Sequence, residues 1–156
     1  VGVIEEDIER NIVKICKPVG VIGALSPSTN PEATPVIKSI NAVKGRNAIV
    51  IAPHPRAKFI NMTIVKKMRD ALEIMGAPAD LVQTMAQPSL GKTEELMKQC
   101  DFILATGGPG MAKAPFMSPE AIPVPAVTDL GTETLLDGLT SAVPSVATIT
   151  ETPIQS

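Results

Sequence analysis

The sequence predicts an α/β fold in which helices cover both faces of a parallel sheet. Three apolar runs, at residues 19–25, 47–52 and 101–105, have the length and the β-branched content of buried parallel strands. Segments with helical signals lie between these runs, and such alternation is typical of βαβ units. The chain has 156 residues, which is about the length of one domain.

The first strand leads into a turn at residues 26–30 and then into a helix. Asn30 precedes Pro31, and this pair predicts a helix N-cap followed by a proline at the first helical position. We expect the helix to run to Lys44 and to end at Gly45, because glycine commonly terminates helices.

The second strand is stopped by a Pro-His-Pro segment, and a longer helix follows. Pro53 and Pro55 flank His54 and stiffen the backbone there. We predict the helix over residues 57–75, since apolar side chains recur every three or four positions, and Gly76 ends it. The predicted apolar stripe consists of Val65, Met68, Leu72 and Met75. We interpret five methionines of the chain as core packing: Met62, Met68, Met75, Met85 and Met97.

The remaining elements are a short strand at residues 81–85, a polar helix at residues 91–99 and the third long strand. In parallel sheets, ligands collect at the carboxyl ends of the strands. Three informative loops follow predicted strands, at residues 26–30, 53–56 and 106–110. We therefore expect any ligand site to form from these loops.

Charge divides the chain into two parts. Residues 1–114 carry all 14 basic residues and 11 of the 16 acidic ones, a balance of +3, whereas residues 115–156 carry five acids and no Lys or Arg. The second part also holds six of the 15 prolines. We therefore predict an α/β domain over residues 1–114 and a divergent, Pro-rich acidic tail over residues 115–156, with strands and loops rather than packed helix.

Composition argues against several classes of function. A net charge of −2 and only three aromatic residues, all Phe, do not favour nucleic-acid binding, which uses basic patches and aromatic stacking. Two cysteines and one histidine are too few for a disulfide scaffold or a structural zinc site. No apolar run reaches the roughly 18–20 residues of a membrane span, and the acidic N-terminal segment is unlike a signal peptide. We expect a cytoplasmic protein with no metal, nucleic-acid or membrane partner.

The loop residues allow both a functional and a plain structural interpretation. Gly107 and Gly108 would let a phosphate approach the backbone before a helix, but a strand-to-helix turn also needs glycine. No GxGxxG fingerprint is present. His54 is either a ligand contact or a polar loop residue, and Arg56 is either an anion contact or a solvated charge.

A segment with the sequence AQPSLGKT, at residues 86–93, resembles a phosphate-binding P-loop whose first glycine is replaced by alanine. Pro88 removes one of the backbone N–H groups that such a loop needs. We therefore favour a simple helix N-terminus here. A P-loop NTPase would instead require ATP binding that depends on Lys92.

Neither cysteine is well placed for nucleophilic catalysis. Cys100 follows the predicted polar helix, where the helix dipole raises rather than lowers the pKa of a thiol. Cys16 follows an apolar alternation, and we interpret it as a packed thiol.

Two segments closely resemble the CoA-acylating branch of the aldehyde dehydrogenase superfamily. They are PVGVIGALSPSTNPEATPVIKSINAVKGRNAIVIAPHPRAK, which begins at Pro18, and ILATGGPGMAKA, which begins at Ile103. The likeness extends over about residues 14–114. It implies a three-layer, Rossmann-like NAD(P)-binding domain without GxGxxG. It also implies an oxidoreductase that converts an aldehyde and CoA to acyl-CoA with NAD or NADP, and homo-oligomers among the full enzymes.

The resemblance also implies roles for individual residues. Asn30 matches the asparagine whose side-chain amide supports the oxyanion formed from the aldehyde, which suits the charge that develops on that oxygen. The matched cofactor contacts are Pro27, Ser28 and Thr29 at the nicotinamide, His54, Pro55 and Arg56 at the adenosine ribose, Gln87 and Pro88 at the adenine, Thr106, Gly107 and Gly108 at the pyrophosphate, and Met111 packed on the cofactor. Non-acylating relatives have Glu where this chain has Ala57, so the choice between NAD and NADP stays open.

The resemblance ends near residue 114, and the family's catalytic cysteine has no counterpart in this sequence. Neither Cys16 nor Cys100 lies in the corresponding motif. We therefore expect the chain alone to bind a nicotinamide dinucleotide without turning over aldehyde. The alternative is a non-catalytic nucleotide-binding or assembly module whose acidic tail docks a partner.

Overall fold

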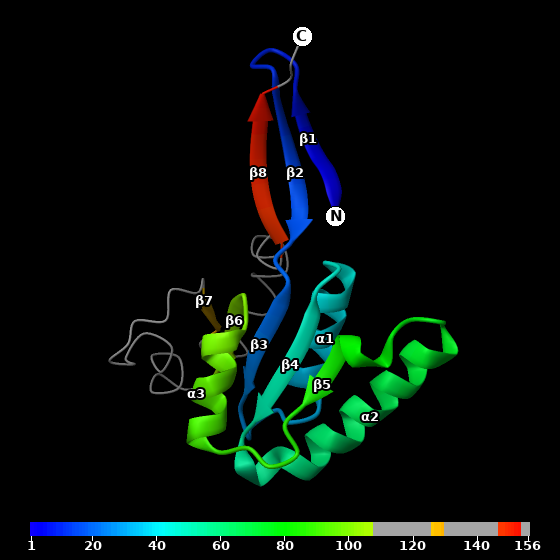
Figure 1. Ribbon diagram of the computed structural model, residues 1–156, viewed down its shortest axis with the longest axis vertical. Coiled ribbons are helices and arrows are strands. Elements are labelled where there is room, and N and C mark those ends of the chain that lie inside the picture. Colours follow the sequence, from blue (N-terminus) through cyan, green and yellow to red (C-terminus); the bar gives the residue numbers. More distant parts are fainter. Residues whose placement is uncertain (108–125, 130–146, 154–156) are drawn as a thin grey trace.

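The computed structural model describes residues 1–107, 126–129 and 147–153, and it contains a large parallel sheet flanked by helices (Figure 1). The strands of this sheet are β3 (Val21–Ser26), β4 (Ala48–Pro53), β5 (Val82–Thr84), β6 (Phe102–Thr106) and β7 (Ala126–Asp129). Their order is β5-β4-β3-β6-β7, and every neighbouring pair is parallel. The three long strands predicted from apolar runs are β3, β4 and β6, so the parallel sheet is confirmed.

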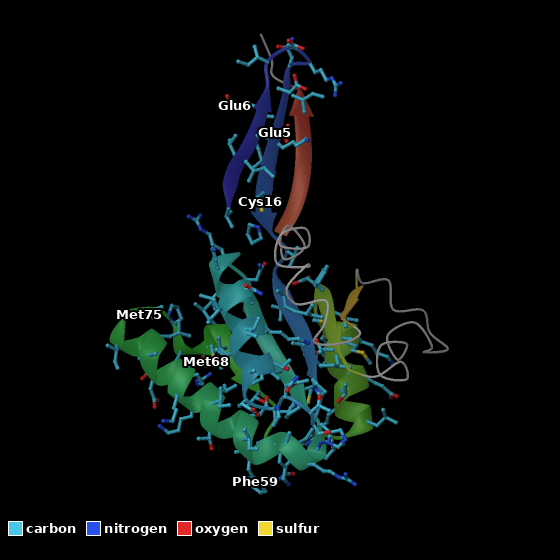
Figure 2. The ribbon with its side chains drawn as sticks, turned by 180° about the vertical axis from the view of Figure 1, so that it is seen from behind. Glu5, Glu6, Cys16, Phe59, Met68 and Met75 are labelled. Carbon is cyan, nitrogen blue, oxygen red and sulfur yellow. The ribbon has the colours of Figure 1, made fainter. Side chains whose placement is uncertain are left out.

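Three α-helices cover the two faces of the sheet. They are α1 (Ala33–Lys44), α2 (Lys58–Ile74) and α3 (Leu90–Gln99), with short 3₁₀ turns η1 (Pro55–Ala57) and η2 (Ala79–Leu81) before α2 and β5. Alternate side chains of β3 point to opposite faces. Ile22 packs with Val65 and Leu72 under α1 and α2, whereas Leu25 packs with Met97 under α3. Figures 1 and 2 show the same three layers from opposite sides. The three-layer α/β architecture is therefore confirmed.

A second, smaller sheet lies beyond the end of the large sheet at which β3 begins (Figure 1). It is antiparallel and has the order β1-β2-β8, formed by β1 (Gly2–Asp7), β2 (Ile12–Pro18) and β8 (Ala147–Pro153). The first strand predicted from the sequence begins at residue 19, so the sequence interpretation missed the β1–β2 hairpin. Most side chains of the hairpin are at least partly exposed, and Glu5, Glu6 and Asp7 interrupt its apolar pattern. The sequence therefore contains no apolar run from which these strands could be predicted.

The start of α1 differs from the prediction. The helix begins at Ala33 rather than at Pro31, and Asn30 is not its N-cap residue. The reason is Pro35, which has no N–H to donate to the carbonyl of Pro31, as a helix starting there would require. In a helix that starts at Ala33, Pro35 falls in the first turn, where the N–H needs no helical partner. The predicted end at Lys44 is confirmed.

The apolar stripe of α2 is buried only in part. Val65 and Leu72 are 2% and 8% exposed, but Met75 is 73% exposed, and Met62 on the same helix is 38% exposed. The core interpretation is therefore wrong for Met62 and Met75. Met75 is the C-cap residue of α2, and Figure 2 shows it at the far end of that helix. Met97 is buried as predicted.

Candidate functional site

The carboxyl ends of the parallel strands bring several loops to one edge of the large sheet, the lower edge in Figure 1. The backbone N–H of His54 donates a hydrogen bond to the carbonyl oxygen of Ser26 over 3.0 Å. This bond joins the last residue of β3 directly to the loop after β4. Because the chain continues from β3 first to one side of the sheet and later to the other, β3 and β6 flank a topological switch point, where α/β sheets bind ligands.

The first loop presents polar side chains to solvent. Ser28 and Thr29 are exposed, whereas Pro27 is buried and Asn30 is half-buried. The carbonyl of Asn30 accepts a hydrogen bond from the N–H of Thr34 over 3.2 Å, which links the loop to the first turn of α1. The hydroxyls of Ser28 and Thr29 are thus accessible to a ligand.

The second loop fixes the orientation of its histidine. Nδ1 of His54 accepts a hydrogen bond from the N–H of Arg56 over 3.2 Å, and the N–H of Ala57 donates to the His54 carbonyl over 2.8 Å. Because Nδ1 is the acceptor, the neutral ring carries its proton on Nε2. The half-buried His54 therefore offers an N–H donor, and the exposed Arg56 offers a positive charge.

The loop after β5 leads into α3 rather than around a phosphate. Ser89 is the N-cap residue of α3, and its Oγ accepts a hydrogen bond from the N–H of Lys92 over 3.4 Å. Nζ of Lys92 donates to the carbonyl of Gln87 over 3.2 Å. Pro88 lies between these residues. The P-loop-like segment is therefore the helix N-terminus that the sequence favours.

The loop after β6 is described only at its beginning. Thr106 and Gly107 are half-buried, and Thr106 pairs with Asp129 of β7. Gly108 and Met111, which the resemblance assigns to the cofactor, lie outside the described residues.

Lys38 on α1 is a site neighbour that the sequence interpretation did not identify. Its Nζ donates hydrogen bonds to the carbonyls of Leu25 (2.7 Å) and Leu104 (2.8 Å), at the ends of β3 and β6. The residue is only 6% exposed. A signal was present, because Lys38 shares the inward face of the helix with Pro35 and Ala42, and a lysine at such a position requires partners.

Two more buried polar groups lie near the same edge. Oγ of Ser26 and Oδ1 of Asn61 have no hydrogen-bond partner within the described structure, although the two residues are 1% and 0% exposed. Asn61 uses its amide nitrogen to donate to the carbonyl of Pro31 over 3.0 Å. Buried polar atoms are normally hydrogen-bonded, so the Ser26 hydroxyl could donate or accept a bond, and Oδ1 of Asn61 could accept one, with a water molecule or a ligand as the partner.

The two cysteines lie away from this edge. Cys100 precedes β6 at the opposite end of the strand, is 4% exposed, and its Sγ donates a hydrogen bond to the carbonyl of Met97 over 3.6 Å. Burial is the main cause that raises the pKa of this thiol. Cys16 lies on β2 of the small sheet and is only partly buried (Figure 2).

Within the described residues, no group of three or more His, Cys, Asp or Glu side chains could hold a metal ion. None of the helices in that part of the chain has the length and apolar character needed to cross a membrane.

The chain is similar to curated acylating enzymes over three quarters of its length. Sulfoacetaldehyde dehydrogenase of Acholeplasma sp is 52% identical over 118 residues, which are 76% of this chain and 24% of that enzyme. Succinate-semialdehyde dehydrogenase (acetylating) of Clostridium kluyveri is 43% identical over 118 residues, which are 76% of this chain and 26% of that enzyme. The chain thus spans about a quarter of the length of these relatives. No protein-family model matches it.

Solved structures show the same relationship. An acetylating aldehyde dehydrogenase from Geobacillus thermoglucosidasius is 43% identical with a TM-score of 0.74, and the match covers 81% of this chain and 27% of that one. A propionaldehyde dehydrogenase from Rhodopseudomonas palustris, with bound CoA and an acylated cysteine, is 33% identical with a TM-score of 0.67, over 75% of this chain and 26% of that one. An engineered glycolyl-CoA reductase with bound NADP+ is 34% identical with a TM-score of 0.69, over 74% of this chain and 26% of that one. The resemblance seen in the sequence is thus confirmed: the homologues of this chain are CoA-acylating aldehyde dehydrogenases, of which it matches a partial domain.

Proposed function

We propose that this chain is the NAD(P)-binding part of an oxidoreductase that converts an aldehyde and CoA to acyl-CoA. One observation carries the proposal: the hydrogen bond from His54 to Ser26, the last residue of β3, brings the starts of the two segments that resemble the family's cofactor segments together at one edge of the sheet. The proposal is supported by relatives whose structures contain NADP+ or CoA.

The residues at this edge suit a ligand with an anionic pyrophosphate. The described loop residues 26–30, 53–57, 85–89 and 106–107 include no Asp or Glu. Arg56 adds a positive charge in the loop after β4. Lys38 adds a positive charge near the end of β3, and Lys92 adds one beside the segment before α3. Parallel-strand ends of this kind bind dinucleotides in other α/β proteins.

In this proposal, each loop contacts a different part of the dinucleotide. Pro27, Ser28 and Thr29 would line the nicotinamide, His54, Pro55 and Arg56 the adenosine ribose, Gln87 and Pro88 the adenine, and Thr106, Gly107, Gly108 and Met111 the pyrophosphate region. The nicotinamide would supply the hydride acceptor for the aldehyde. The Asn30 amide would donate to the negative oxygen derived from the aldehyde, and CoA would act as a co-substrate of the complete, homo-oligomeric enzyme.

Calorimetric titration of the purified chain with NAD, NADP and CoA tests the proposal. We expect at least one nicotinamide dinucleotide to bind and to raise the melting temperature, because a ligand that binds only the folded state stabilises it. Gly107→Val should abolish binding, since a side chain there would keep phosphate from the backbone. Gly91→Val is the matched control, because a Cβ at Gly91 on α3 points into open space.

The outcomes separate the proposal from its rivals. A folded chain that binds neither dinucleotide would contradict it and favour an assembly module. ATP binding lost in Lys92→Ala would favour the NTPase. We also propose that the chain alone turns over no aldehyde, because Cys16 and Cys100 lie away from the loops. Measurable CoA- and NAD-dependent aldehyde oxidation would overturn this part.

A further inference from the structure

The ladder between β3 and β6 ends where the candidate site begins. The pairing runs from Ile22–Phe102 to Leu25–Ala105, and beyond it the two strands continue into separate loops. No further rung of the ladder holds these loops at a fixed separation. Lys38 reaches this position from α1, on the face opposite α3.

The Lys38 ammonium bonds both strands at once. Nζ lies 2.7 Å from the Leu25 carbonyl oxygen and 2.8 Å from the Leu104 carbonyl oxygen, and the side chain is almost completely buried. Hydrogen bonds from a charged donor are stronger than those between neutral groups. A buried lysine is also costly unless such acceptors compensate its lost hydration, so the arrangement fixes all three elements relative to one another.

We propose that Lys38 is a positioning residue whose ammonium ties the carboxyl ends of β3 and β6 together and sets the separation of the loops that follow them. Those loops contain Ser28–Asn30 on one side and Thr106 and Gly107 on the other. The consequence for ligand binding rests on the proposed function: the tie holds the nicotinamide and pyrophosphate segments ready for one dinucleotide, and the fixed positive charge favours its phosphates.

Hydrogen exchange tests the tie without any ligand. In Lys38→Met the aliphatic stem is largely kept and the ammonium is lost. We expect amides of residues 28–30 and 105–107 to exchange about tenfold faster, as in a local opening, with α2 unchanged. Lys38→Arg should restore most of the protection, because a guanidinium can donate to two acceptors. Lys44→Met, at the exposed end of the same helix, controls for the lost charge.

A measurement on the unmodified chain covers the case in which Lys38→Met does not fold. The ammonium protons of Lys38 should exchange with solvent far more slowly than those of the exposed Lys44, as observed by nitrogen-15 NMR. Equal exchange rates for the two ammonium groups would overturn the tie. Unchanged local exchange in a folded Lys38→Met variant would do the same.

Titrations with NAD and NADP then test the ligand consequence. We expect Lys38→Met to weaken both dinucleotides by a similar factor of about ten, which corresponds to the loss of one charge-assisted interaction. Lys44→Met should stay within about twofold, as for surface charges. Unchanged affinity in Lys38→Met would contradict the consequence for binding. If the unmodified chain binds neither dinucleotide, the proposed function fails, whereas the exchange measurements still decide the role of Lys38.

Discussion

The backbone before β3 requires glycine at position 20. The φ of Gly20 is +117°, and a Cβ built there would overlap the carboxylate of Asp101. That carboxylate accepts a hydrogen bond from the N–H of Val21 over 2.8 Å. The close approach of the carboxylate to the backbone therefore depends on the missing side chain and on the left-handed backbone that glycine tolerates.

We predict that Gly20→Ala lowers the free energy of unfolding by at least about 2 kcal/mol, because strain and overlap add together. Gly76→Ala is the control: Gly76 also has a positive φ, +74°, but a Cβ there meets nothing within 4 Å. Its cost should be about 1 kcal/mol from backbone strain alone. Urea denaturation measures both values, and equal costs would show that contact with Asp101 is unimportant.

Cys100 should make stability depend on pH in the alkaline range. Burial raises the pKa of its thiol, so the folded chain holds this proton more tightly than the unfolded chain. The resulting stabilisation is complete below the unfolded pKa and is lost as pH rises through the higher folded pKa. We predict that the free energy of unfolding falls more between about pH 8 and pH 10 in the parent than in Cys100→Ala. Parallel slopes for the two proteins would contradict this.

Among the elements, α2 separates buried from exposed apolar positions that look alike in the sequence. Leu72 is 8% exposed and packs in the core beneath α2, whereas Met75 is 73% exposed. We predict that Leu72→Ala costs about 2–4 kcal/mol of unfolding free energy, because it leaves a cavity. Met75→Ala should stay within about 0.5 kcal/mol. Thermal or urea denaturation of the pair tests this, and comparable losses would place Met75 in the core.

Only part of the fold could be predicted from patterns in the sequence. Apolar runs identified β3, β4 and β6 because both faces of these strands are covered, so their sequences are apolar throughout. Helical periodicity placed α2 but could not show that the helix ends at Ile74 and leaves the C-cap residue Met75 exposed. The β1–β2 hairpin was missed for the converse reason, since it is largely exposed and its pattern is broken by charge.

Predicting the candidate site depended on different information. Strand-end logic alone indicated the loops at residues 26–30 and 53–56, and the structure joins them through His54 and Ser26. Helical spacing puts Lys38 on the inward face of α1, but its two acceptors, Leu25 and Leu104, could not be predicted because they are far apart in the sequence. The roles of the individual loop residues came from resemblance and remain predictions.

At the scale of the whole molecule, two strands from beyond residue 114 complete the two sheets. β7 adds to β6 at the edge of the large sheet, and β8 pairs with β2 along its whole length, from Ile12–Pro153 to Pro18–Ala147. The small sheet therefore joins β1 and β2 to a strand that follows the large sheet in the sequence, and no residue of β1 or β2 belongs to the two buried core clusters of the described structure.

We predict that the two sheets respond separately to loss of β8. In a chain that ends at residue 146, amides of β2 should exchange about tenfold faster or more, because half of the ladder of β2 is gone. The slowly exchanging amides of β3 and β4 should be unaffected. Thr150→Pro, opposite Ile15, should give the same pattern at full length, since proline cannot donate to a ladder. Loss of protection throughout the large sheet would show that the two sheets fold as one unit.

The strand order also has a consequence for synthesis on the ribosome. β3 is the earliest strand of the large sheet and lies at its centre, so β4 and β5 can add to one side as they emerge, and β6 and β7 to the other (Figure 1). The strand with which each new strand of the large sheet pairs has therefore already been synthesised. The small sheet is completed in the opposite order: β2 is synthesised before any strand of the large sheet, but its second edge stays open until β8 has been synthesised after them. The nascent chain thus carries an unpaired strand edge while the strands of the large sheet are synthesised, and unpaired edges are prone to pair with the wrong partner.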